Sequence, residues 1–273
     1  MPAHVTVVVP CYRCASSVGR AVRSAFEQTR RPLELIAVDD ASDDTTPEVL
    51  EALQRECGVD WLRVIRLEDN LGPSVARNTG WEAARGEYVA FLDADDSWFP
   101  NKIERQLKFM RAHPEYIATG HRAQYRQMVA TTGSESSAGQ TYREISRCRM
   151  LLKNPMVTPS LMVRRECGIR FHAQSRYMED HRFLQDLVFT GSRVARLDEV
   201  LAFIPKHAFG DAGLSAQLWG MERAELNNYL ALRKAGHIGF TAHNLLALYS
   251  LVKFVRRLAT IGVRRLLARH PAP

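Results

Sequence analysis

The chain has 273 residues, a formal net charge of +7 and a hydrophobic fraction of 46%. This composition is that of an ordinary globular protein, and it excludes a disordered or fibrous chain. A chain of this length buries enough surface to fold around its own core without a disulfide or a structural metal. The positive charge alone is compatible with nucleic acid, a membrane surface or an anionic substrate as the partner.

The charge is unevenly distributed along the chain. The 48 residues after Glu225 contain eight basic residues and no acidic one. Residues 1–225 contain 29 basic and 30 acidic residues, so their net charge is −1. The high isoelectric point therefore describes the C-terminal tail and not the body of the protein.

Short apolar runs alternate with helical patterns over about the first 110 residues. The apolar runs cover residues 5–10, 33–38, 61–67 and 87–92. Helical spacing covers residues 15–28, 45–57 and 73–85. This alternation predicts βαβ units and an α/β fold with a mostly parallel sheet covered by helices on both faces. Ligands of such sheets bind beyond the carboxyl ends of the strands.

Carboxylates follow two of the predicted strands. Asp39 and Asp40 end the second strand, and residues 93–96 (DADD) follow the fourth. The sequence contains neither of the glycine-rich motifs, G-x-G-x-x-G and G-x-x-x-x-G-K-[ST], that bind phosphates through main-chain amides. Carboxylates repel a bare phosphate, but Mg²⁺ or Mn²⁺ between them removes the conflict. The pattern predicts a site for a complex of a metal and a nucleotide.

The spacing of Asp93 and Asp95 favours a metal site. The preceding strand presents both side chains on the same side because strands have a period of two residues. Two carboxylates placed in this way repel each other unless a cation lies between them. We expect Asp95 to be the direct ligand and Asp93 to lie nearer the ribose or a metal-bound water. A solvated acidic turn is the alternative, and Asp96 is expected to cap a helix over residues 99–111.

Four ordered segments resemble the glycosyltransferase family 2 enzymes. They are residues 7–12 (VVVPCY), 35–46 (LIAVDDASDDTT), 70–78 (NLGPSVARN) and 91–96 (FLDADD). The resemblance implies the GT-A fold, a Rossmann-like and mostly parallel sheet flanked by helices, here with a C-terminal helical appendage. It also implies an inverting, metal-dependent glycosyltransferase that uses Mn²⁺ or Mg²⁺ and a nucleotide diphosphate sugar, expected to be a UDP-sugar.

The resemblance implies roles for single residues in donor binding. Asp39 is expected to contact the uracil ring or its ribose, and Arg77 to reach the acidic strand ends or the nucleotide. The other expected donor-binding residues in this half are Pro10, Tyr12, Asp40 and Asp93. Asp39 and Asp40 could instead end a strand and begin an Asx-turn, and ordinary capping explains most of the segment around Arg77.

The second half resembles the family more loosely. Glu179 and Asp180 precede a helical pattern over residues 181–189, where acidic residues favour the helix dipole without any catalysis. The resemblance implies that this pair supplies the general base, which we assign to Asp180 with Glu179 as the alternative. Residues 207–215 (HAFGDAGLS) form either a lid over the diphosphate or a plain surface loop, with His207 as the candidate donor-binding residue.

The C-terminal tail has an amphipathic helical pattern. Its apolar positions are Leu248, Leu251, Val255, Leu258, Gly262 and Leu266, and the opposite face carries Lys253, Arg257 and Arg264. The apolar face could pack on the catalytic domain, or the helix could bind anionic lipid. No stacking aromatics or recognised module supports a nucleic acid partner. Because a secretory signal and an 18-residue apolar stretch are absent, we expect a cytoplasmic protein bound peripherally to the cytosolic face of the membrane.

These features predict three parts of the chain. Residues 1–115 are the expected nucleotide-sugar-binding half, residues 116–220 the acceptor-binding half with the base, and residues 221–273 the basic tail. The expected acceptor is a glycan or a lipid-linked oligosaccharide of bacterial surface polysaccharide assembly. A sugar-phosphate nucleotidyltransferase is one alternative, although it should carry a glycine-rich basic loop after the first strand. A catalytically inactive membrane scaffold is the other.

Overall fold

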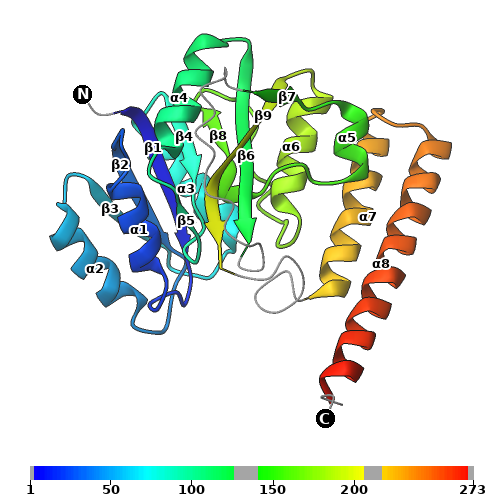
Figure 1. Cartoon of the computed structure of the whole chain (residues 1–273), viewed down its shortest axis with the longest axis horizontal. Coiled ribbons are helices and arrows are strands. Elements are labelled where there is room, and N and C mark those ends of the chain that lie inside the picture. The colour runs from blue at the N-terminus through cyan, green and yellow to red at the C-terminus, as the bar shows by residue number, and fades with distance from the viewer. Residues whose placement is uncertain (1–2, 126–140, 206–216, 270–273) are drawn as a thin grey trace. The chain divides into compact units, whose positions relative to one another are not determined.

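The structure is a computed structural model that describes residues 3–125, 141–205 and 217–269. The chain divides into two compact units, Met1–Ala208 and Phe209–Pro273. The first unit is an α/β domain, and the described part of the second consists of two helices (Figure 1).

Strands and helices alternate through the first part of the α/β unit. The order is β1 (Ala3–Cys11), α1 (Val18–Phe26), β2 (Pro32–Asp39), α2 (Thr46–Cys57), β3 (Leu62–Arg66), α3 (Pro73–Glu82), β4 (Tyr88–Phe91), β5 (Ser97–Trp98) and α4 (Lys102–Ala112). The predicted βαβ alternation is therefore confirmed. The second part contains β6 (Tyr116–Tyr125), β7 (Tyr142–Glu144), α5 (Arg147–Leu152), the 3-10 helix η1 (Thr158–Ser160), β8 (Met162–Arg164), α6 (Glu179–Phe189) and β9 (Arg193–Ile204).

Within the described residues, nine strands form one sheet in the order β3-β2-β1-β4-β8-β6-β9-β5, with β7 paired to β9. The first four strands are parallel, because β1 pairs in parallel with β2 and β4, and β2 with β3. Strand β8 is antiparallel to both β4 and β6, whereas β6 and β9 are parallel. The parallel half therefore presents the carboxyl ends of its strands along one edge.

Alternate residues of β2 pack against helices on opposite faces of the sheet. Leu35 belongs to the core that contains α1, α2 and α4, whereas Ile36 and Val38 pack with Ala76 of α3. Helix α3 lies close to the sheet at Gly80, where a Cβ atom would be only 2.5 Å from a methyl group of Val8. This packing places the start of α3 beside the carboxyl ends of the parallel strands.

An aromatic cluster joins α6 to α3 and β4. The ring centroids of Trp81 and Phe91 are 5.3 Å apart, and those of Phe91 and Phe171 are 5.0 Å apart. Phe183 of α6 stacks on Phe171 at 4.6 Å and meets Trp81 edge-on at 5.8 Å. Such pairs stabilise beyond the area they bury. The cluster holds α6 against α3 and β4.

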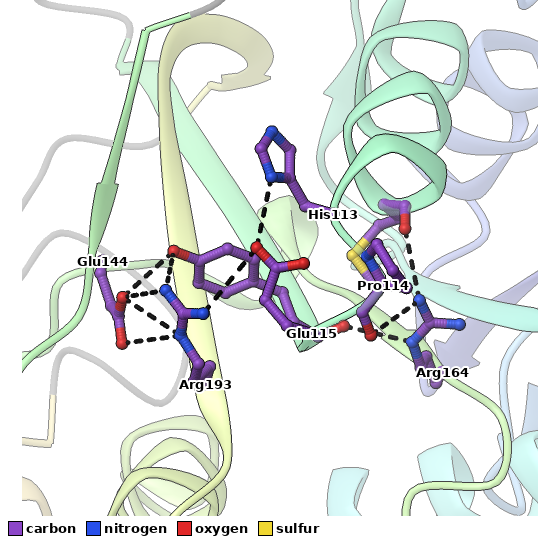
Figure 2. Close-up of polar contacts among 8 residues, drawn as sticks. His113, Pro114, Glu115, Glu144, Arg164 and Arg193 are labelled. Atoms are coloured by element: carbon purple, nitrogen blue, oxygen red, sulfur yellow. Dashed lines mark hydrogen bonds and ion pairs between the residues drawn. The ribbon is translucent and has the colours of Figure 1, made fainter.

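A polar network joins the amino ends of β6 and β9 (Figure 2). Arg193 donates to the carboxylate of Glu144 at 2.6 Å and to the hydroxyl of Tyr116 at 2.9 Å. Arg164 of β8 donates to the main-chain oxygen of Tyr116 at 3.2 Å. Burial and the hydrogen bond with Glu144 raise the pKa of Tyr116 to about 12. Arg193 follows the last residue of α6 in the chain, whereas Glu179 is the first residue of that helix.

The second unit contains α7 (Leu218–Lys234) and α8 (Phe240–Arg269), so the predicted helical appendage is confirmed. Ser250 of α8 donates to Glu222 of α7 at 2.8 Å, and Lys253 forms an ion pair with Glu225. Lys253, predicted on the basic face opposite the apolar positions, is thus engaged by an acidic residue of α7.

Large apolar side chains lie on another face of α8. Leu245, Leu248, Val252 and Val255 are each exposed by 60% or more of their surface. Along the described residues, every helix is too short or too polar to cross a membrane.

Candidate active site

The carboxyl ends of β1, β2 and β4 bring several predicted donor-binding residues to one edge of the sheet. Pro10 pairs in register with Val38, and the end of β1 pairs with Asp39. Tyr12 follows β1 and is 42% exposed, and Asp93 follows β4 closely. Residues far apart in the sequence therefore meet where a parallel sheet binds its ligand.

Asp39 presents a carboxylate oxygen without a hydrogen bond at this edge. Its Oδ1 accepts from the main-chain nitrogen of Ser42 at 3.1 Å. Its Oδ2 is buried and has no hydrogen-bond partner among the residues that the structure describes, although Arg66 Nε lies 3.5 Å away. A buried acceptor without a hydrogen bond is costly. A ring N–H or a ribose hydroxyl fits this position.

Asp40 is engaged by the chain itself. Its two carboxylate oxygens accept from the main-chain nitrogens of Leu71 and Gly72, both at 2.8 Å. Gly72 has a φ of 89°, a left-handed conformation that favours glycine, and it precedes the first residue of α3. Asp40 therefore holds the loop that begins α3, and its contact with the donor stays a prediction.

Arg77 joins the donor edge to the acidic pair on α6. It is 4% exposed, and its guanidinium donates to Asp93 Oδ1 and to Glu179 Oε1, both at 2.8 Å. Burial lowers the pKa of Arg77, but the charges of Asp93 and Glu179 outweigh it, so the pKa is raised. The structure thus brings three predicted site residues from α3, the β4 loop and α6 into one network.

The acidic pair opens α6. The preceding Met178 has a φ of 55°, a left-handed conformation that is uncommon for this residue type. Asp180 is half-buried, and its Oδ1 accepts from the main-chain nitrogen of His181 at 2.7 Å. Its Oδ2 accepts from the Asn154 side chain at 2.8 Å. Burial raises the pKa of Asp180, against the opposing effects of these hydrogen bonds and of the Arg77 charge.

The predicted metal loop forms a tight turn. Asp96 donates its main-chain nitrogen to the oxygen of Asp93 at 3.0 Å, and the main-chain oxygen of Asp95 accepts from Arg20 at 2.6 Å. The predicted capping role of Asp96 is wrong. Residues 97–98 form β5, and α4 begins only at Lys102, with Asn101 as its N-cap.

Asp93 and Asp95 supply ligands of the right kind for a hard divalent cation. In the part of the chain that the structure describes, no three His, Cys, Asp or Glu side chains converge as a metal-binding group. Mg²⁺ commonly takes only one or two carboxylates and completes its shell with water and phosphate oxygens. The half-exposed Asp95 and the neighbouring Asp93 therefore fit a cation that binds together with a diphosphate.

Two residues of the site were not predicted from the sequence. Asn154, from the segment between α5 and η1, contacts Asp180, as described above. Tyr125 ends β6, and burial together with the charges of Asp96 and Asp180 raises its pKa. No motif surrounds either residue, so no local signal was available. The predicted donor-binding residue His207 lies outside the described residues, as does its loop.

The sequence model of glycosyl transferase family 2 matches residues 6–171, more than half of the chain. The UDP-Glc:alpha-D-GlcNAc-diphosphoundecaprenol beta-1,3-glucosyltransferase WfaP of Escherichia coli is 32% identical over 116 residues, which are 42% of this chain and 44% of that protein. The succinoglycan biosynthesis protein ExoO of Rhizobium meliloti is 30% identical over 200 residues, 71% of this chain and 53% of that protein. The chain spans about half the length of these curated relatives.

Solved structures with the same fold include S. aureus TarS 1-349 in complex with UDP-GlcNAc. Its TM-score is 0.68 at 20% identity, and the match covers 92% of this chain and 72% of that one. The mannosyltransferase PcManGT from Pyrobaculum calidifontis, in complex with GDP-Man and Mn²⁺, has a TM-score of 0.65 at 19% identity, with coverage of 97% and 81%. These likenesses confirm the predicted GT-A fold. The chain belongs to glycosyl transferase family 2.

Proposed function

We propose that the protein is an inverting glycosyltransferase that moves a sugar from a UDP-sugar to an acceptor hydroxyl during assembly of a bacterial surface polysaccharide. The observation that carries the proposal is the Arg77 bridge, which holds Asp93 at the donor edge and Glu179 beside Asp180. Family membership supports the transfer chemistry. The names of WfaP and ExoO support a nucleotide-sugar donor and a lipid-linked or glycan acceptor.

Asp180 is the proposed general base. It takes the proton of the acceptor hydroxyl while that oxygen attacks the anomeric carbon from the face opposite the nucleotide. The bond between the anomeric carbon and the diphosphate breaks, so the anomeric configuration is inverted. A raised pKa suits this role because a base is most effective when its pKa approaches the working pH. Glu179 is the weaker candidate because it is more deeply buried than Asp180 and forms an ion pair with the buried Arg77.

Asp95 and Asp93 are the proposed ligands of Mg²⁺ or Mn²⁺. When bound, such a cation supplies positive charge that stabilises the diphosphate leaving group. Asp39 offers its Oδ2, which accepts no hydrogen bond from the described residues, to the base or the ribose of the nucleotide. Arg77 keeps Asp93 in place at the donor edge.

Substitution of the base and of the metal ligand tests the proposal. Asp180→Asn should lower sugar transfer or donor hydrolysis by at least about 100-fold, because proton abstraction is lost, while UDP still binds. Asp95→Ala should weaken UDP binding measured by calorimetry with Mn²⁺ and have little effect in the presence of a chelator. A panel of nucleotide sugars, with and without Mn²⁺, identifies the donor.

Asp186→Asn is the matched control for the base. Asp186 lies six residues beyond Asp180 on the same helix and pairs with Arg182 at 2.9 Å. Its variant should keep near-normal turnover. Near-normal turnover of Asp180→Asn would refute the assignment of the base. Absence of any metal-dependent UDP binding by the unmodified protein would favour an inactive scaffold.

We also propose that the second unit attaches the protein peripherally to the cytosolic face of an anionic membrane. The exposed apolar side chains of α8 and the uniformly basic tail support this partner. Apolar side chains gain from entering the lipid interface, and Lys and Arg gain from anionic headgroups. A second copy of the chain is a poorer partner, because pairing would bring two positively charged tails together.

A further inference from the structure

We infer that Asn154 is a positioning residue that aims the carboxylate of Asp180 at the acceptor hydroxyl. The inference rests on the proposed function, because it assigns a role within the same site. Asn154 Nδ2 donates to Asp180 Oδ2 at 2.8 Å, and the main-chain nitrogen of His181 donates to Oδ1 at 2.7 Å. Each carboxylate oxygen thus has a donor from a different segment, and the two bonds together fix the plane of the carboxylate.

The amide of Asn154 is itself held in one orientation. Its Oδ1 accepts from the main-chain nitrogen of Met156 at 3.3 Å, while its nitrogen faces Asp180. A flipped amide would set an N–H against the Met156 N–H and an oxygen against the Asp180 carboxylate, so both contacts would become repulsive. Pro155 follows and restricts the backbone of Asn154 to extended conformations. The donor is therefore pre-arranged before substrate binds.

Asn154 also affects the ionisation of Asp180. Burial favours the protonated acid, whereas a hydrogen bond donated to the carboxylate favours the charged form. Asn154 therefore helps to keep the base ionised at a pH where burial alone would protonate more of it. Among the described residues, the other titratable and charged groups that act on Asp180 include Arg77, Asp93, Glu179 and Tyr125.

Two substitutions in the full-length chain separate this role from a purely structural one. Asn154→Asp keeps an oxygen for the Met156 amide but replaces the donor with a second carboxylate. The acid limb of the kcat/KM profile should then move to higher pH by roughly one unit or more, because two neighbouring carboxylates resist ionising together. At neutral pH kcat should fall about tenfold, with UDP affinity unchanged. Asn154→Ala should also move the acid limb of the kcat/KM profile to higher pH, but by a smaller amount.

Gln54→Ala is the control for loss of a side-chain amide. Gln54 Nε2 donates to the main-chain oxygen of Leu62 at 2.9 Å, which joins α2 to β3 away from the proposed site. This variant should keep the pH profile of the unmodified enzyme. An unchanged acid limb in Asn154→Asp, with or without lower stability, would overturn the inference and leave Asn154 with a loop-holding role only.

A measurement without turnover separates this inference from the proposed function. NMR titration of ¹³C-labelled aspartate carboxyls, with Asp180→Asn to assign the signal, reports the pKa of Asp180 directly. Asn154→Asp should raise that pKa even if no donor sugar is turned over. If the pKa of Asp180 rises in Asn154→Asp but the unmodified protein transfers no sugar, the proposed function is refuted and the role of Asn154 toward Asp180 stands. If the pKa of Asp180 is unchanged in Asn154→Asp, the inference is refuted.

Discussion

Arg77 shows how much of this site depends on one side chain. A guanidinium is a planar fork that can donate to two carboxylates at once, whereas an ammonium is a point charge on a flexible stem. Arg77 uses that fork to join Asp93 and Glu179, which are 86 positions apart in the chain. Its position one turn into α3 predicted a reach toward the acidic strand ends, but only the fold brings α6 within reach.

Arg77→Ala should lower both stability and donor binding. Removing one partner of a buried charge network leaves the other charges unpaired, at a cost of about 3 kcal/mol in the free energy of unfolding. UDP binding should weaken by at least about tenfold because Asp93 loses its orientation. Denaturant unfolding and calorimetry measure the two effects, and Arg77→Lys should recover only part of either.

Arg193→Ala is the matched control for this prediction. Arg193 also contacts two acidic residues, Glu144 and Glu115 (Figure 2), but its side chain is 46% exposed and it follows the C-terminal end of α6. Solvent screens such pairs strongly. The control should lose much less stability and keep UDP binding. Equal losses in the two variants would contradict the special role of the Arg77 bridge.

At the scale of elements, the site depends on how closely α3 lies on the sheet. Gly80 permits that approach, because an added Cβ would meet Val8 at 2.5 Å and Val38 at 3.2 Å. On the other side of the same helix end, Trp81 packs in the aromatic cluster with Phe183 of α6. Helix α3, which carries Arg77, is thus held in place by strands β1 and β2 and by α6, which supplies Glu179.

Gly80→Ala should push α3 away from β1 and disturb the Arg77 bridge. Overpacking of this kind costs about 1–3 kcal/mol, and UDP binding should weaken with it. Gly19→Ala is the control, since Gly19 lies in α1 and a Cβ there meets only the flexible end of Arg23. The stability of the Gly19→Ala variant should be unchanged or slightly higher, because alanine favours the helical conformation more than glycine does. A Gly80→Ala protein as stable as Gly19→Ala would argue against the close-packing account.

The sequence predicted the parallel half of the fold well, because its apolar runs and helical patterns are local signals. Strand β5 was missed because two residues carry no pattern of their own, and the same omission made Asp96 look like a helix cap. Asn154 and Tyr125 were missed for another reason. Their roles follow from packing between distant segments, and a single polar residue without a motif gives no sign of its spatial neighbours.

At the scale of the whole molecule, charge and exposed apolar surface are concentrated in the second unit. Residues 1–225 are nearly neutral, whereas the last 48 residues carry eight positive charges. Lys253 is engaged by Glu225 within the helix pair, so it contributes less to an external partner than the sequence suggested. Leu248 and Val252 lie on the exposed face of α8 and are the side chains expected to enter a lipid interface.

Leu248→Glu combined with Val252→Glu should reduce binding to vesicles of phosphatidylglycerol and phosphatidylcholine at least about tenfold in a sedimentation assay. Thr241→Glu combined with Asn244→Glu changes the charge of α8 equally at exposed polar positions and should reduce binding much less. Binding of the unmodified protein should also weaken with salt. No binding of the unmodified chain to anionic vesicles would refute the membrane proposal. Dimers abolished by the Leu248 and Val252 changes would point to a second copy instead.

The short strand β5 has a consequence for exchanging specificity between related enzymes. It follows the Asp93–Asp96 turn and pairs with β9, with Ser97 opposite Phe203 and Trp98 opposite Ala202. A chimera that takes its acceptor half from another family member would replace β9 and remove the partner that sets the register of this turn. Chimeric enzymes joined at a point between residues 98 and 202 should therefore be impaired in their use of the donor as well as altered in their choice of acceptor. Acceptor choice can be exchanged without loss of donor use only if the β9 strand of the other enzyme still pairs with β5.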